Sequence, residues 1–337
     1  MRAYLLAYQI DGDPADLAAA RDVARWLMDF MRAPDGAFYT SQDADAGAVH
    51  GDAFYARDDA ARRAGPQPPI DRNRYARENG WAIASLAALF DVTGDQMLID
   101  AAVRAFDWVL VNRRAPTGGL GHGRASDDDT HLGDTLAMAE AALALYRSTA
   151  ERRYLALAIE WGEVIVRDHR DPAGGFMVRQ PEPGARGVLA KPVRQVDENV
   201  AAVRLLNLLA RQAARPAFRE AAEHGKRYLI SLAEDDLILP GALLADRELG
   251  REPAHVTIVG AKDDPAARAL YEAARTYPTR YFRIEWLDRR EGPLPAADVE
   301  YPELPEAAAF ACANGACSVP VFSPTDVHRI AVKVDDR

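Results

Sequence analysis

The sequence predicts a mainly α-helical protein in which hairpins of two helices form a toroid, followed by a small α/β module and a β-hairpin. Three observations lead to this fold class. An apolar pattern with helical spacing recurs at fixed offsets, every second helix is richer in alanine and leucine, and the helical pattern stops near residue 250. We therefore expect a helical-hairpin domain over residues 1–250 and a smaller domain over residues 251–337.

The repeat has three copies, which start at Asp13, Asp95 and Glu151. Counted from each start, an aliphatic residue stands at +4, an alanine at +7, a bulky apolar residue at +13, a glycine at +23 and Phe or Leu at +25. The apolar spacing is that of one helix face, and we expect each glycine to end its helix. The repeat positions are occupied by Leu17, Ala20, Trp26, Gly36 and Phe38; by Ile99, Ala102, Trp108, Gly118 and Leu120; and by Leu155, Ala158, Val164, Gly174 and Phe176.

Each copy is preceded by another apolar helix. A short connector such as Asp-Gly-Asp or Thr-Gly-Asp joins the two helices and makes an antiparallel hairpin. The first helix of each pair is the richer in Ala and Leu, which is typical of a helix buried on most sides and makes it the inner helix of the toroid. We expect the preceding helices over residues 4–9, 75–92 and 132–148, and a fourth hairpin over residues 199–212 and 216–232.

Beyond residue 250 the sequence predicts a βαβ unit, with strands over residues 255–260 and 280–287 and a helix over residues 265–276. A proline-rich connector leads to a hairpin centred on Asn314-Gly315. Cys312 then faces Cys317 in a non-hydrogen-bonded pair, in which Cα atoms lie about 4.5 Å apart. Such a pair could close a disulfide. The alternative, two reduced thiols, is favoured by the usual state of cytosolic cysteines.

Composition excludes several classes of function. The chain has 41 Lys and Arg against 51 Asp and Glu, and its net charge of -10 repels a phosphate backbone, so we expect no nucleic-acid partner. No apolar run reaches a membrane span of about 18 residues, and the start of the chain is too polar for a signal peptide, which predicts a cytoplasmic protein with no membrane partner. Two cysteines without nearby histidines in metal spacing predict no metal, and no motif calls for a cofactor.

Candidate functional residues lie in the loops that join each outer helix to the next inner helix, because these loops all open on one face of a toroid. They carry carboxylates, amides and aromatic side chains, the groups that bind sugars, and a pair of carboxylates supplies acid and base where a glycosidic bond is cleaved. Each residue also has a structural interpretation. Asp134, Asp197 and Glu198 fall in first helical turns, where acids cap free N–H groups, and the Asp127–Asp129 run is typical of a solvated loop.

Several segments together resemble the C-terminal part of the YyaL or spermatogenesis-associated family of thioredoxin-domain proteins. The specific ones are the S-Q-D-A-D string over residues 41–45 and the C-x4-C-x2-P string over residues 312–320, with Asn79-Gly80-Trp81, Leu132-Gly133-Asp134 and Gly174-Gly175-Phe176 between them. The resemblance implies an (α/α)6 toroid similar to N-acylglucosamine 2-epimerases and six-hairpin glycosidases. It also implies a thioredoxin-like domain before the toroid.

The chain departs from that family in three respects. It has no counterpart of the thioredoxin-like domain, Glu78 stands where the family has Trp, and Val196-Asp197-Glu198-Asn199-Val200 keeps only the Asn of a Pro-Ser-Gly-Asn-Ser pattern. The repeat accounts for eight helices where a closed six-hairpin toroid needs twelve. We therefore expect an incomplete toroid, a fragment or split-gene product completed by an upstream thioredoxin-like domain or another polypeptide.

The sequence thus predicts a carbohydrate-associated toroid that binds or acts on a sugar-like ligand by glycosidase-like or epimerase-like acid–base chemistry. Epimerase chemistry would use a histidine pair, for which His122 and His131 are candidates. The alternatives are a non-catalytic scaffold for a thioredoxin-like partner and a redox protein acting through its two cysteines. We expect the catalytic carboxylates to come from Asp45, Glu78, Asp134 and Glu198, and the ligand contacts from Tyr39, Gln42, Asp43, Asn79, Trp81, His122, Asp197 and Asn199.

Overall fold

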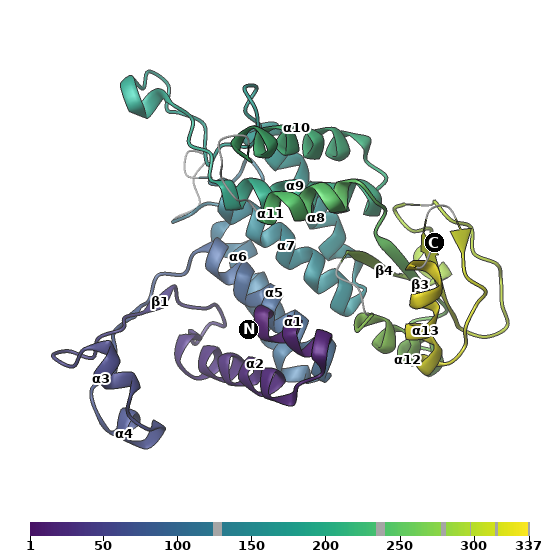
Figure 1. The fold of residues 1–337 in the computed structure, drawn as a ribbon, viewed down its shortest axis with the longest axis horizontal. Coiled ribbons are helices and arrows are strands. Elements are labelled where there is room, and N and C mark those ends of the chain that lie inside the picture. Colours follow the sequence, from purple (N-terminus) through teal and green to yellow (C-terminus); the bar gives the residue numbers. More distant parts are fainter. Residues whose placement is uncertain (124–129, 234–239, 278–280, 297, 314–315, 336–337) are drawn as a thin grey trace.

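The computed structural model describes residues 1–123, 130–233, 240–277, 281–296, 298–313 and 316–335. Within these residues, four antiparallel hairpins form the helical part of the molecule (Figure 1). The first helices of the hairpins pack side by side, α1 on α5, α5 on α7 and α7 on α9, and each second helix lies outside its partner. This arrangement confirms the predicted toroid class. The hairpins are α1 (Arg2–Asp11) with α2 (Pro14–Trp26), α5 (Ala76–Thr93) with α6 (Gln96–Arg113), α7 (Leu132–Thr149) with α8 (Arg152–Val164), and α9 (Val196–Gln212) with α10 (Pro216–Ala233).

The predicted repeat register is confirmed by the outer helices. Both α2 and α8 continue into a π-helical turn of five residues, Leu27–Met31 and Ile165–His169, at the same repeat positions. Each outer helix is then followed by a single antiparallel bridge to the residue at +25, namely Arg32 with Phe38, Arg114 with Leu120 and Arg170 with Phe176.

The expectation that a glycine ends each outer helix is wrong. The helices end at Met31, Arg113 and His169, before the repeat glycines. Each glycine lies instead in the tight turn inside the bridge, where φ is 101° at Gly36 and 97° at Gly118, a conformation that residues with a Cβ rarely adopt.

The short connectors of the hairpins have the expected chemistry. The side chains of Asp13 and Asp95 accept hydrogen bonds from the N–H groups of Ala15 and Met97 and so cap the outer helices. The inner helices α1 and α5 end on glycines in the left-handed conformation, as is common at helix C-termini. Connector chemistry therefore determines where the first two hairpins turn, whereas α7 ends on Ala150 and Glu151 makes no side-chain capping bond to α8.

An arm that the sequence did not predict lies between α2 and α5. It projects from the helical body in Figure 1 and contains two short helices and a two-stranded antiparallel ribbon. Ser41 pairs with Asp71 and Gln42 with Ile70. The elements of the arm are β1 (Ser41–Gln42), α3 (Gly51–Tyr55), α4 (Asp59–Ala64) and β2 (Ile70–Asp71).

The C-terminal part is a four-stranded sheet in the order β4-β3-β5-β6. The predicted βαβ unit is confirmed, because β3 (Ala254–Val259) and β4 (Phe282–Leu287) are parallel and joined through α12 (Pro265–Arg275). β5 (Ala308–Ala313) pairs antiparallel with β3, and β6 (Ala316–Cys317) with β5. Further elements not predicted are α11 (Pro240–Leu249), α13 (Pro324–Asp335) and the 3-10 turns Gly187–Ala190 and Arg289–Glu291.

Cys312 faces Cys317 across β5 and β6, as the hairpin register predicted, with Cα atoms 4.1 Å apart. The two sulfurs form a disulfide, so the structure corrects the favoured expectation of reduced thiols. The Asn314-Gly315 turn and the Asp127–Asp129 run lie outside the described residues.

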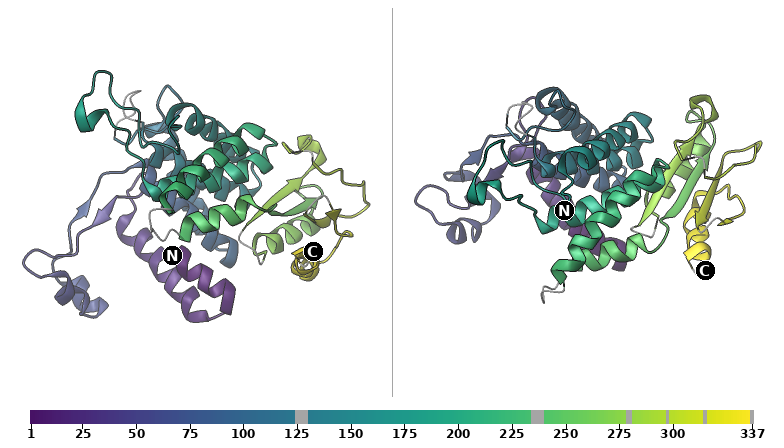
Figure 2. Two further views of the ribbon diagram at one scale, coloured as in Figure 1. Left: turned by 45° about the horizontal axis from the view of Figure 1, so that its top comes forward. Right: turned by 90° about the horizontal axis from the view of Figure 1, so that it is seen from above.

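The sheet lies at one side of the helical body in Figure 2, against the C-terminal ends of the inner helices. The hydroxyl of Tyr271 donates to the carbonyl of Arg147 at 2.8 Å, and Asn207 Nδ2 donates to the hydroxyl of Tyr281 at 2.6 Å. A cavity of about 260 Å³ lies at this junction and is lined by residues of α1, α5, α7, α9 and β4. None of the helices in the described residues is long and apolar enough to cross a membrane.

Candidate functional site

Three carboxylates occupy the same position on three neighbouring inner helices. Glu78, Asp134 and Glu198 are each the third residue of their helix, in α5, α7 and α9. Because these helices are parallel members of one inner layer, the shared position places all three acids at the N-terminal mouth of the toroid. The N-terminal ends of the helices also favour negative charge there.

Arg77 lies among these carboxylates. Its guanidinium donates to Oε1 of Glu78 from Nε at 3.1 Å and from Nη2 at 3.0 Å, and its backbone N–H donates to Oδ1 of Asp134 at 2.9 Å. The guanidinium also lies 5.2 Å from the ring centroid of Trp81, which is 49 % exposed. Asp134 thus caps the first turn of the neighbouring helix α5. The same side chain is therefore both a helix cap and a member of the candidate site.

Glu198 reaches the cluster past Gly133. A Cβ at Gly133 would lie 2.5 Å from Oε1 of Glu198 and 3.2 Å from Cδ of Arg77. Only glycine therefore allows the Glu198 carboxyl to lie against the first turn of α7 and next to Arg77. The Glu198 side chain is otherwise enclosed, with 7 % of the residue exposed.

The environment raises the pKa values of two of the acids. Burial, helped by the charges of Asp197 and Asp134, raises the pKa of Glu198 to about 7, against the opposing effect of Arg77. Burial also raises the pKa of Asp134, although His122 acts in the opposite direction. Oε2 of Glu78 and Oε2 of Glu198 are buried and have no hydrogen-bond partner within the described residues. A carboxyl with a near-neutral pKa and unused buried oxygens is typical of a functional site.

His122 is held at the edge of the cluster. Its Nδ1 lies 2.9 Å from Oδ2 of Asp134, and its ring stacks on Tyr75 with centroids 4.3 Å apart. The ring of His131 lies 5.3 Å away, so the structure brings the two candidate histidines together. A carboxylate on one ring nitrogen fixes the orientation of an imidazole and leaves Nε2 for a second partner.

Asn79 and Asn199 have a different environment from the carboxylates beside them. Both are 0 % exposed. Oδ1 of Asn199 accepts from the N–H of Phe176 at 2.7 Å, and its Nδ2 donates to the carbonyl of Phe176 at 2.9 Å. Asn79 makes the same pair of bonds to Phe38, and the hydroxyl of Thr135 accepts from the N–H of Leu120. These side chains anchor the outer-helix loops at the +25 repeat position.

The other candidate residues are not part of the cluster. Tyr39, Gln42, Asp43 and Asp45 lie at the base of the arm or on it, and Asp45 accepts a hydrogen bond from the N–H of Gly51 at 2.8 Å. Gln42 accepts from the indole of Trp26 at 3.2 Å. Within the described residues, the side chains of these four residues make no hydrogen bond or ion pair with Arg77. Asp197 is exposed beside Glu198 and contributes its charge.

Two residues of the cluster, Arg77 and Tyr75, were not singled out from the sequence. The available signal was the alignment of the first turns of α5, α7 and α9, in which Arg77, Gly133 and Asp197 stand directly before the three carboxylates. Within the described residues, no group of three or more His, Cys, Asp or Glu side chains could hold a metal ion. A cleft of about 790 Å³ lies between the loop that precedes α7 and the loop that joins α8 to α9, and its lining includes Thr130, His169 and Gln180.

The sequence matches no protein-family model and no curated protein. Among solved structures, this chain is similar to cellobiose 2-epimerase from Spirochaeta thermophila DSM 6192, with TM-score 0.50, 18% identity, 68% of this chain covered and 57% of that chain. A sugar epimerase from a ruminal bacterium has TM-score 0.49 and 13% identity, with 66% of this chain and 57% of that chain covered. A family 105 glycoside hydrolase from C. acetobutylicum ATCC 824 has TM-score 0.48 and 11% identity, with 68% of this chain and 61% of that chain covered. The chain thus spans a little over half the length of the epimerases. The likeness to cellobiose 2-epimerase shows that the chain has the α/α toroid fold.

Proposed function

We propose that the N-terminal mouth of the toroid binds a sugar-like ligand and that its side chains donate protons to this ligand and accept protons from it. The observation that carries this proposal is the cluster of Glu78, Asp134 and Glu198 around Arg77. Buried carboxylate oxygens without partners suit the hydroxyl donors of a sugar, and the exposed ring of Trp81 offers an apolar surface for a sugar ring.

Glu198 and His122 carry the chemistry in this proposal. With its pKa raised to about 7, the Glu198 carboxyl is present in both protonation states near neutral pH and can donate a proton. His122, oriented by Asp134, accepts one through Nε2. A pair of groups that can donate and accept protons suits epimerisation of a sugar, the reaction named for the cellobiose 2-epimerase to which this chain is similar.

Asn79 and Asn199 act as positioning residues in this proposal, because their polar atoms hold the backbone of the loops and do not face a ligand. The four arm residues Tyr39, Gln42, Asp43 and Asp45 stand outside the catalytic centre. They would reach a ligand only if it extended from the cluster toward the base of the arm.

The membership in the YyaL family, the thioredoxin-like partner and the cytoplasmic location belong to the proposal as well. The family membership and the partner are supported by the S-Q-D-A-D and C-x4-C-x2-P strings of the sequence. Co-purification with an upstream thioredoxin-like polypeptide, measured by gel filtration of the two chains expressed together, tests the partnership. Separate elution of the two chains would argue against it.

Binding is tested with a panel of mono- and disaccharides by saturation-transfer NMR. We expect binding of at least one sugar to the wild-type chain and its loss in Glu78→Gln and Trp81→Ala. The matched control is Asp100→Asn, an equal change of charge on the exposed side of the outer helix α6. Equal binding by all variants would place the sugar elsewhere on the molecule.

A further inference from the structure

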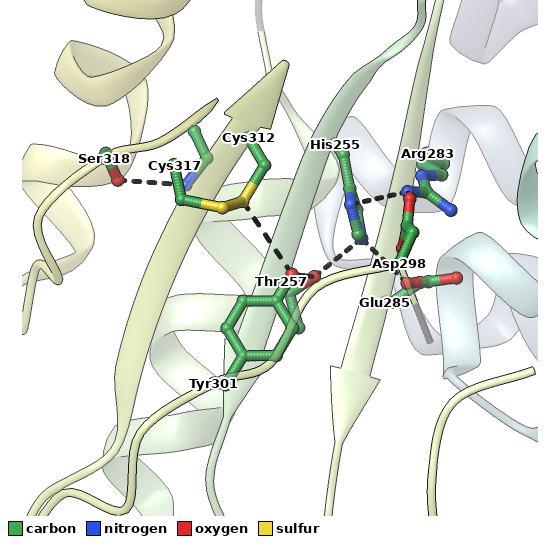
Figure 3. The surroundings of a disulfide bond; sticks show 10 residues. His255, Thr257, Arg283, Glu285, Asp298, Tyr301, Cys312, Cys317 and Ser318 are labelled. Carbon is green, nitrogen blue, oxygen red and sulfur yellow. Dashed lines mark hydrogen bonds and ion pairs between the residues drawn. A yellow bond between two sulfur atoms is a disulfide. The ribbon is translucent and has the colours of Figure 1, made fainter. Parts of the chain in front are cut away.

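The disulfide between Cys312 and Cys317 has two different sides. Cys312 lies on β5 and is 4 % exposed, whereas Cys317 lies on the edge strand β6 and is exposed (Figure 3). β6 has only two residues, and beyond it Ser318 N–H donates to the carbonyl of Ala311 at 2.8 Å. Cys317 is therefore the solvent-exposed half of the disulfide, and Cys312 is the buried half.

A chain of buried polar side chains begins at the inner sulfur. The hydroxyl of Tyr301 lies 3.9 Å from Sγ of Cys312 and donates to Oγ1 of Thr257 at 2.8 Å. Oγ1 of Thr257 lies 2.8 Å from Nε2 of His255, which lies 2.8 Å from Oε2 of Glu285. Thr257 and Glu285 are 0 % exposed, so this chain of side chains is buried beneath the surface of the molecule.

The protonation of this chain follows from its donors. A guanidinium can only donate, and Nη2 of Arg283 lies 2.8 Å from Nδ1 of His255, so Nδ1 accepts and the ring proton is on Nε2. Burial raises the pKa of Tyr301 to about 12, so its hydroxyl keeps its proton and remains a donor. Tyr301 is thus the donor that faces the disulfide.

We propose that Cys312–Cys317 is a thiol–disulfide exchange site for a dithiol reductant, with Cys317 as the attacked sulfur and Cys312 as the leaving thiolate. A thiolate of the dithiol attacks Sγ of Cys317, the bond between the two cysteines breaks, and its electron pair leaves on Sγ of Cys312. The second thiolate of the reductant then attacks its own sulfur in the mixed disulfide and releases Cys317. The reductant becomes a disulfide, and both cysteines take up the two protons that the dithiol loses.

Tyr301 is a positioning residue for this exchange. In the disulfide state its hydroxyl bonds to Thr257, and when Cys312 becomes a thiolate the same hydroxyl can turn its proton to the nearby sulfur. A hydrogen bond to the leaving thiolate favours its departure and speeds the exchange. A purely structural disulfide would need no such donor beside its buried sulfur.

Accessibility is tested by equilibrating the full chain with dithiothreitol at graded ratios of reduced to oxidised reagent. Free thiols are then blocked with a maleimide and counted by mass spectrometry, while circular dichroism follows the fold. We expect a reversible two-electron transition in a chain that stays folded. Reduction only after the chain unfolds would overturn the proposal.

The direction of attack is tested with single-cysteine variants and glutathione disulfide. Cys312→Ser leaves the exposed Cys317, which should form the mixed disulfide readily. Cys317→Ser leaves the buried Cys312, which should react at least ~10-fold more slowly. Equal rates, or faster reaction at Cys312, would contradict the assignment of the attacked sulfur.

The role of Tyr301 is tested by the rate of reduction with dithiothreitol. Tyr301→Phe should slow the reaction by about 10-fold, because the leaving thiolate loses a charge-assisted hydrogen bond. Tyr281→Phe removes a hydroxyl that contacts Asn207 in the same module and should leave the rate unchanged. Equal rates in both variants would remove Tyr301 from the proposal, and the two cysteine variants would still test the exchange site.

Discussion

The side-chain amide of Asn79 binds both polar groups of the Phe38 backbone, 41 residues earlier in the chain, through an accepted bond of 2.7 Å and a donated bond of 3.0 Å. Asn199 does the same to Phe176. Each amide fixes the loop that leaves an outer helix to the first turn of an inner helix. The residue just before each amide is a carboxylate of the cluster, so the same turn of helix anchors a loop and presents an acid.

Asn199→Ala should destabilise the fold strongly. The substitution leaves the buried N–H and carbonyl of Phe176 without partners, at about 1–3 kcal/mol for each group, so we expect a loss of about 3 kcal/mol. Urea unfolding measures this loss. Asn112→Ala is the control, since the side chain of Asn112 donates to the carbonyl of Trp108 on an exposed helix face, and it should change stability by less than about 0.5 kcal/mol. Equal effects of the two variants would show that the amide anchor contributes little.

The contribution of Glu198 to the stability of the chain should fall as pH rises from about 5 to 8. The pKa of Glu198 is raised from 4.5 to about 7 in the folded state, so folding favours the protonated carboxyl. This contribution is complete below pH 4.5 and is lost as pH rises through 7. In urea unfolding at several pH values, Glu198→Gln should gain stability relative to the wild type as pH rises through 7. The exposed Glu220→Gln should keep the wild-type pH dependence.

Gly80→Ala should destabilise the chain although alanine favours helices by about 1 kcal/mol. A Cβ at Gly80 would lie 2.6 Å from the backbone carbon of Ala137, so this glycine allows close contact between α5 and α7. We expect a net loss of about 1–3 kcal/mol from overpacking, measured by thermal unfolding. Ser85→Ala on the same helix meets no such contact and should be neutral within about 0.5 kcal/mol. A stabilised Gly80→Ala chain would contradict the close approach of the two helices.

Asp134→Asn should lower the turnover of the proposed reaction without unfolding the chain. The amide can still accept the hydrogen bond from Arg77 N–H, but it no longer supports a proton-accepting imidazole at His122. We expect kcat to fall about 100-fold or more, with a smaller change in KM. His122→Ala should show a similar fall in kcat. The double variant Asp134→Asn with His122→Ala should have a kcat only a little lower than either single variant. Additive losses would show that the two residues act independently.

The sequence alone predicted the hairpins and their register well, because fixed offsets between aliphatic residues, alanines and connectors leave little freedom to a helical pair. It also singled out Glu78, Asp134 and Glu198. Their common helical position and the presence of Arg77 beside them became visible only once the inner helices lay next to one another.

The arm explains why the sequence grouped some residues with this cluster that the structure places away from it. A polar loop of unknown path gives no spatial information, so Asp43 and Asp45 were expected at the mouth of the toroid, whereas they follow β1 in the arm that projects away from it. The state of Cys312 and Cys317 could not be predicted for a similar reason. Register shows that two sulfurs are close, but the redox state depends on the environment of the sulfurs.

The most direct test of the proposed function is a proton NMR experiment in deuterium oxide with mannose, glucose and cellobiose as substrates. The proposal predicts that the wild-type chain exchanges the proton at C2 of at least one of these sugars for deuterium, and that Glu198→Gln and His122→Ala abolish the exchange while Asp100→Asn retains it. Unchanged exchange in Glu198→Gln, or sugar turnover without any exchange at C2, would contradict proton transfer at this cluster.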